Sequence, residues 1–78
     1  MNLFAEELTN ALAMTLGDLA KDIIVRGCRN IGTTYEKVNP EHFEDLMATI
    51  RDSLEQIYPS DFVDVIITKI VLAIKGRF

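Results

Sequence analysis

The chain has 78 residues, of which 49% are hydrophobic, and its eight basic and twelve acidic residues give a net charge of −4. A chain of this length forms one small domain, residues 1–78, and its acidic balance argues against a polyanionic partner. A single cysteine, Cys28, excludes an intrachain disulfide and predicts a soluble, cytoplasmic protein. Because small domains have proportionally more surface, the high apolar content indicates that a second chain covers part of it.

Residues 3–31 carry one apolar stripe and predict a single long helix. At about 100° per residue, nine apolar side chains fall on one face: Ala5, Leu8, Leu12, Leu16, Leu19, Ala20, Ile23, Ile24 and Ile31. The stripe keeps its phase along the whole segment, as one continuous helix requires. Gly17 leaves an alternative open, in which two helices are bent at residues 15–17 and Thr15 caps the second of them.

Residues 32–38 form a connector, and a second helix is predicted over about residues 40–57. Asn39 is a good N-cap, and Pro40 suits the first helical position. Apolar residues then recur at spacings of three and four: Phe43, Leu46, Met47, Ile50, Leu54 and Ile57. Pro59 ends this helix.

A third helix is predicted over about residues 61–75, where the sequence FVDVIITKIVLAI is almost entirely apolar. This run is shorter than the about 20 residues that a bilayer requires and contains Asp64 and Lys69, which excludes a membrane span. On a helix, the polar residues gather within about 60° of arc: Asp61, Asp64, Thr68 and Lys75. The rest of the circumference is apolar apart from Lys69, so we expect burial on several sides, with Ser60 as the cap.

These elements predict an all-α fold, in which a long N-terminal helix is followed by a C-terminal helical hairpin. The first helix would be about 43 Å long and the hairpin helices about 27 and 22 Å, so the hairpin covers only about half of the first helix. Pairing of two copies resolves the mismatch and predicts a homodimeric helical bundle. The alternatives are a four-helix monomer bent near Gly17 and association with a helix of a different chain.

The last helix supplies both core and contact residues in this scheme. Ile66, Ile70 and Ile74 are expected in the core or the dimer contact. Five residues are candidates for contact with a second copy or a partner: Leu12, Leu16, Leu19, Val65 and Leu72. The predicted function is therefore that of a small, non-enzymatic protein–protein interaction module.

Residue patterns of catalytic, cofactor or metal sites do not occur in the sequence. His42, the only histidine, is expected to be a solvated residue of a first helical turn, and Cys28 a buried or half-buried small hydrophobe. The carboxylates of the second helix lie on its polar face, where they aid solubility. We predict no enzymatic activity and no cofactor.

The only locally basic region surrounds the end of the first helix and the connector. It offers four candidate phosphate contacts: Lys21, Arg26, Arg29 and Lys37. The nearby carboxylates of Asp18, Asp22 and Glu36 dilute this charge and favour a solvated, salt-bridged face.

The stretch DLAKDIIVRGCRNIGTTYEKVNPEHFEDLM, Asp18 to Met47, resembles the second half of a histone-fold subunit. In that family a long central helix leads through a short extended loop into a helix with a polar cap. The resemblance implies an obligate dimer with a role in transcription or chromatin, and it implies that Arg26, Arg29 and Lys37 lie near phosphates. It covers under half of the chain, and no short helix precedes the long one. Nucleic-acid-associated regulation is the alternative function.

Overall fold

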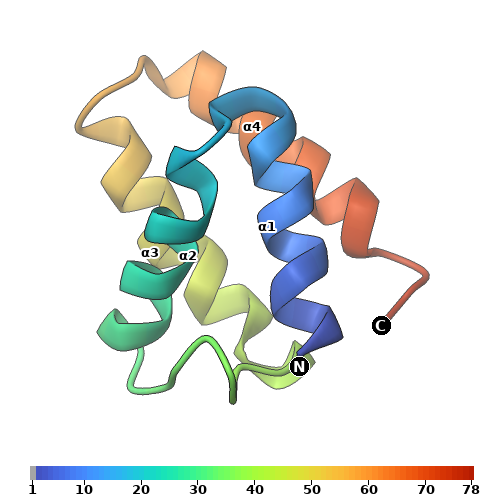
Figure 1. The fold of residues 1–78 in the computed structure, drawn as a ribbon. Coiled ribbons are helices and arrows are strands. Elements are labelled where there is room, and N and C mark those ends of the chain that lie inside the picture. The colour runs from blue at the N-terminus through green and yellow to red at the C-terminus, as the bar shows by residue number, and fades with distance from the viewer. Residues whose placement is uncertain (1) are drawn as a thin grey trace.

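A computed structural model describes residues 2–78, and the structured part of this range is entirely helical (Figure 1). The elements are α1 (Leu3–Leu16), α2 (Leu19–Asn30), the 3₁₀ turn η1 (Pro40–His42), α3 (Phe43–Glu55) and α4 (Ser60–Ile74). Helix α1 packs against α2 and α4, and α3 packs against α2 and α4, so the four helices enclose one apolar core. The all-α prediction is confirmed.

The prediction of one continuous helix over residues 3–31 is wrong, because the chain turns back at Gly17. Gly17 has φ 59° and ψ −131°, a conformation that is essentially restricted to glycine, and its N–H donates to the carbonyl of Ala13 at 2.9 Å. A straight helix of about 43 Å would also exceed the longest extent of the molecule, 32 Å. Thr15 lies inside α1 and does not cap α2, which begins after Asp18 without a side-chain cap.

The apolar stripe of residues 3–31 is nevertheless the face that the two helices bury. Leu8 and Leu12 on α1 are fully buried, as are Ala20 and Ile24 on α2. Two helices separated by a short break can carry stripes in the same phase, so the phase does not distinguish one helix from two. The break lets both halves of the stripe face the same core.

A glycine sets the contact between α2 and α3. A Cβ atom placed on Gly27 would lie 2.7 Å from Cδ1 of Leu46 and 3.4 Å from Cγ1 of Ile50. The side chains of Leu46 and Ile50 are both fully buried. The missing side chain of Gly27 therefore allows α3 to pack close to the backbone of α2.

The connector between α2 and α3 is held by Asn2, which also caps α1. Its Oδ1 accepts from the N–H of Ala5 at 3.2 Å, while its Nδ2 donates to the carbonyls of Val38 at 2.6 Å and Glu36 at 3.1 Å. One side chain thus satisfies an unpaired N–H at the helix start and holds the connector, which turns at residues 35–37, against it.

The start of the second predicted helix is encoded locally, as expected. Asn39 is the N-cap, and its side chain accepts from the N–H of Glu41 at 2.8 Å. Nδ1 of His42 accepts from the N–H of Asn39 at 3.1 Å and completes a capping box, a role that glutamate or glutamine usually takes. Pro40 stands at the first position, and α3 proper begins at Phe43 after this 3₁₀ turn.

Helix α4 forms where the third helix was predicted, with Ile66, Ile70 and Ile74 buried in the core. Ser60 is its first residue rather than its cap, because Pro59 occupies the N-cap position without a side-chain hydrogen bond. Over residues 2–78, none of the helices combines the length and apolar character needed to cross a membrane.

Candidate functional site

The outer face of α4 carries a row of three apolar side chains and one lysine that the other helices leave uncovered. We call this row the α4 stripe: Phe62, Val65, Lys69 and Leu72, spaced at three, four and three residues. This spacing places the four side chains within about 80° of arc on one helix face. Phe62 is 40% exposed, Val65 51% and Leu72 67%. The opposite face of the same helix, including Ile66 and Ile70, is buried.

One edge of the α4 stripe is polar, and along it the residues change from acidic through neutral to basic. Asp61, Thr68 and Lys75 recur at intervals of seven residues, and all three are exposed. The acidic residue stands at the beginning of the helix and the basic residue at its end. Within residues 2–78, neither Asp61, Lys69 nor Lys75 makes an ion pair. These charges are therefore available to a partner.

Asp64 is the exception on this helix, because it is already engaged inside the molecule. Nη1 of Arg51 on α3 donates to Oδ1 of Asp64 at 2.5 Å. This hydrogen bond, with the negative charges of Asp64, Glu55 and Asp52, raises the pKa of the Arg51 guanidinium. The pair links α3 to α4 at the surface and lies outside the α4 stripe.

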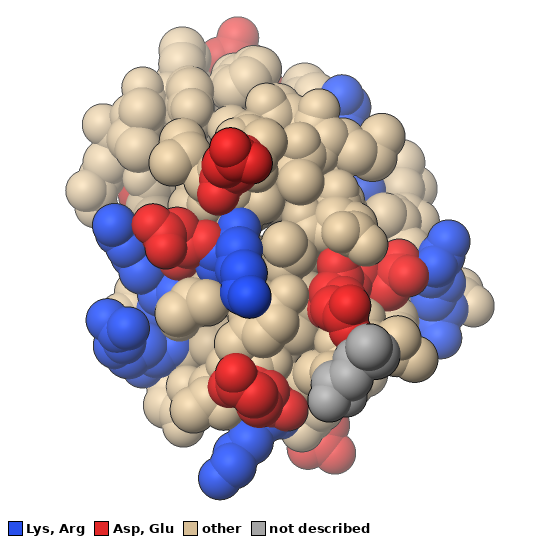
Figure 2. All heavy atoms as spheres, viewed as in Figure 1, with Lys and Arg blue, Asp and Glu red and all other residues tan. Residues whose placement is uncertain are grey.

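Further exposed apolar side chains occur near both helix turns at one end of the bundle. Met14 and Leu19 flank the α1–α2 turn, and Ile57 lies in the α3–α4 turn. Figure 1 shows both turns at the top of the view, and Figure 2 shows that this upper part of the surface is mostly uncharged. Lys, Arg, Asp and Glu side chains are spread over the middle and lower parts of the same face, on both its left and right sides.

The structure divides the predicted contact residues into two groups. Leu19, Val65 and Leu72 are at the surface, whereas Leu12 is fully buried among the helices of its own chain and Leu16 is half-buried. Leu12 is therefore not available to a partner in this arrangement. Its burial follows from the break at Gly17, which folds the end of α1 against α2 and α4.

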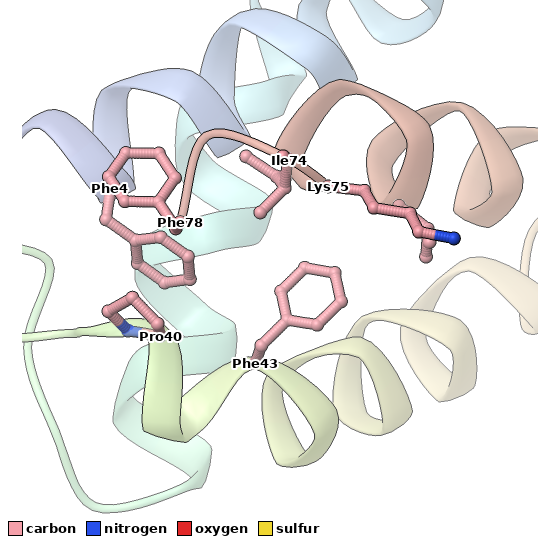
Figure 3. Close-up of a pocket in the computed structure, with 8 residues that line it drawn as sticks. Phe4, Pro40, Phe43, Ile74, Lys75 and Phe78 are labelled. Carbon is pink, nitrogen blue, oxygen red and sulfur yellow. The ribbon is translucent and has the colours of Figure 1, made fainter.

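At the opposite end of the bundle, three aromatic rings surround an open apolar cavity of about 350 Å³ (Figure 3). Phe4 lies edge-on to Phe43 and to Phe78, with ring centroids 6.4 and 5.2 Å apart. Pro40 and Ile74 complete the walls, and Lys75 lines the rim. In Figure 3 the ammonium of Lys75 points away from the rings, so no charged group is directed at the centre of the cavity. Sequence patterns missed this cluster because its members come from three distant segments.

The cysteine and the histidine, which could in principle take part in catalysis, have structural roles here. Cys28 is buried; burial raises the pKa of its thiol, and the nearby carboxylate of Glu36 raises it further. The side chain therefore stays a neutral thiol near pH 7. This agrees with the prediction that Cys28 acts as a small hydrophobic residue. His42 lies in the first turn, as predicted, where it is half-buried and completes the capping box. Residues 2–78 contain no group of three His, Cys, Asp or Glu side chains that is close enough to hold a metal ion.

The four predicted phosphate contacts are exposed but are not gathered into one site: Lys21, Arg26, Arg29 and Lys37. Lys21 and Arg29 line a groove of about 240 Å³ together with the acidic Glu36. Nζ of Lys21 stands 5.1 Å from the ring centroid of Tyr35, while Arg26 lines a different groove beside α3. Figure 2 shows acidic and basic side chains interspersed on this side of the molecule.

No protein-family model matches this chain, and neither a curated protein nor a solved structure shows significant similarity to it. The histone-fold resemblance implies a long central helix, and the structure does not contain one there. Helix α2 has 12 residues and follows the 14-residue α1 across the break at Gly17.

Proposed function

We propose that this chain is a small helical interaction module that acts through the α4 stripe and performs no chemistry of its own. The supporting observation is the set of large apolar side chains on the outer face of α4, above all Leu72, which is 67% exposed. Monomeric proteins seldom expose contiguous apolar rows, and such rows often mark surfaces that bind another protein. A domain this small also gains from association because its own core is limited.

The size of the stripe favours association of moderate strength. Full burial of a Val, Leu or Phe side chain contributes about 1.5–3 kcal/mol, and about half of each stripe residue remains to be buried. Two copies of the stripe would therefore contribute roughly 7 kcal/mol before the cost of association, which is at least about 4 kcal/mol. We expect a complex that dissociates on dilution and that includes further apolar contacts such as Met14, Leu19 or Ile57.

The test is the solution mass of the purified chain, measured by light scattering over a range of concentrations. The wild-type chain is expected to associate, and Leu72→Glu is expected to abolish association because it places a carboxylate inside the contact. Leu3→Glu is the matched control, since Leu3 is 64% exposed on a different helix. A helical circular dichroism spectrum should be kept by both variants.

If Leu72→Glu associates as strongly as the wild-type chain, the α4 stripe is not the interface. A wild-type chain that stays monomeric at every concentration contradicts the homodimer. In that case the stripe remains open to an apolar helix of a different chain, and the test moves to binding of amphipathic helical peptides in solution.

Nucleic-acid contact through Lys21, Arg26, Arg29 and Lys37 is the competing proposal, and its support is weaker. Only two of these cations share a groove, and Glu36 lines that groove with them. Phosphate contact predicts binding to DNA or RNA that falls steeply with added salt. Fluorescence anisotropy with a labelled duplex and a labelled single strand at low salt tests this proposal. Absence of binding to both at low salt would exclude nucleic-acid contact.

A further inference from the structure

We propose, on the basis of the function proposed above, that the α4 stripe binds the α4 stripe of a second copy of this chain, with the two helices antiparallel about a twofold axis beside Thr68. The partner is thus identical to the chain itself, and the orientation of the pair is fixed. Both parts of this proposal rest on the order of residues along α4.

The apolar residues match when the two helices run in opposite directions. The centre of the stripe lies midway between Val65 and Lys69, so Phe62 faces Leu72 of the second copy and Val65 faces Lys69 of the second copy. The long aliphatic part of a lysine side chain can cover an apolar neighbour while its ammonium reaches water. Lys69 therefore fits beside a valine and does not have to be buried as a charge.

The polar edge of the stripe matches in nearly the same register, because its centre at Thr68 lies one residue, about 1.5 Å along the helix, from the centre of the apolar pairs. An antiparallel pair places Asp61 beside Lys75 of the second copy, and the twofold axis repeats this contact at the other end. Thr68 then lies beside Thr68 of the second copy. Lys75 is the C-cap of α4, with φ −60° and ψ 130°, and its N–H still donates to the carbonyl of Val71 at 2.9 Å, so its Cα atom continues the helical path on which this match depends. Both charges lack ion-pair partners within residues 2–78.

A parallel arrangement would give the opposite result. It would place Lys69 beside Lys69 of the second copy, and it would put the two polar edges on opposite flanks of the pair, where neither Asp61 nor Lys75 meets an opposite charge. A sequence that has acid at one end, base at the other and a neutral residue midway is complementary to its own reverse. Such self-complementarity is what a twofold interface requires, and it favours a second copy over an unrelated chain.

Site-directed cross-linking tests the orientation. Thr68→Cys should be converted into a covalent dimer by a short thiol-reactive cross-linker, because the two cysteines lie beside the twofold axis. Asp61→Cys is the control, since the two copies of residue 61 would be about 21 Å apart along an antiparallel pair. The wild-type chain controls for Cys28, which is buried and should not react. Cross-linking of Asp61→Cys as fast as that of Thr68→Cys would contradict the antiparallel pair and overturn the proposal.

Charge exchange tests the register. Asp61→Lys and Lys75→Asp should each weaken self-association by about tenfold, because each replaces two attractive contacts per dimer with two repulsive ones. The double variant restores opposite charges and should return close to the wild-type dissociation constant. Additive weakening in the double variant would overturn the proposed register.

These experiments separate failure of the orientation from failure of the proposed function. If Leu72→Glu abolishes association but Thr68→Cys does not cross-link at concentrations where it is a dimer, the stripe is an interface and the antiparallel pair is wrong. If Leu72→Glu leaves association unchanged and Thr68→Cys does not cross-link, both proposals fail. Cross-linking of Thr68→Cys alone, with loss of association in Leu72→Glu, supports both.

Discussion

The two faces of α4 are built from the same kinds of residue but have different environments. On the inner face Ile66 and Ile70 are 1% and 0% exposed, whereas on the outer face Val65 and Leu72 are 51% and 67% exposed. The difference arises because α1 and α3 pack on only one side of α4. An apolar composition therefore indicates that a helix face is to be buried. Which face is buried inside the protein depends on where the other helices pack.

The largest difference between the faces is expected from truncation of one isoleucine and one leucine. Ile70→Ala should lower the free energy of unfolding by about 2–5 kcal/mol, because it leaves a cavity in a fully packed core. Leu72→Ala should change the stability of the monomer by no more than about 0.5 kcal/mol. Urea denaturation at concentrations where the chain is monomeric measures both values. Similar losses for the two variants would mean that the faces are not distinct.

A second test adds a methyl group to the inner surface at Gly27. Gly27→Ala gains about 1 kcal/mol of helix propensity but forces Leu46 to move, and such overpacking costs about 1–3 kcal/mol. We expect net destabilisation of roughly 1 kcal/mol, measured by thermal or urea unfolding. The double variant Gly27→Ala with Leu46→Ala is the control, since it should lose less than the two single effects combined. A stabilised Gly27→Ala would show that the contact between α2 and α3 is loose.

Cys28 reports on access to the interior without any substitution. A thiol-reactive dye should label Cys28 slowly in the native protein and rapidly in denaturant, because the side chain is buried. Its raised pKa also gives a pH dependence: above the ordinary thiol pKa of about 8.5, the unfolded chain releases the proton while the folded chain keeps it. Stability contributed by Cys28 is therefore complete below this pH and is lost as the pH rises through the raised value. Fast native labelling at neutral pH would contradict this assignment.

The smallest effect is expected at the surface contact between α3 and α4. Asp64→Asn removes the partner that raises the pKa of Arg51. The guanidinium remains solvated, so the loss of stability should be small and should disappear at high salt. Unfolding curves at low and high ionic strength measure this change. A large loss that persists in salt would mean that this contact organises the hairpin.

Local signals predicted the second half of the chain well. The Asn39–Pro40 pair marks the start of a helix through backbone chemistry confined to a few residues, and the structure has its cap there. Periodicity on α4 identified Ile66, Ile70 and Ile74 as core residues because a helix face is defined by spacing alone. The role of His42 in the capping box was missed, because the known motif has glutamate or glutamine at that position.

The features that sequence patterns missed depend on contacts between distant segments. Gly17 marked a possible bend in the sequence, but a stripe that keeps its phase did not show that the chain folds back there so that α1 packs against both α2 and α4. The cluster of Phe4, Phe43 and Phe78 likewise forms only after three segments have met. For the candidate surface, spacing identified Val65 and Leu72 as a flank of α4, but only the packed structure shows that this flank is uncovered and that Leu12 is not.

The contact between α1 and α4 also bears on how this protein is made. The first and last helices of the bundle lie against each other, whereas the other helix contacts join neighbours in the chain. During synthesis, the apolar face of α1 can meet α2 early, but its second partner exists only once α4 has left the ribosome. Until α4 has emerged, the nascent chain therefore carries Leu8 and Leu12 partly uncovered, and exposed apolar surface of this kind is prone to aggregation.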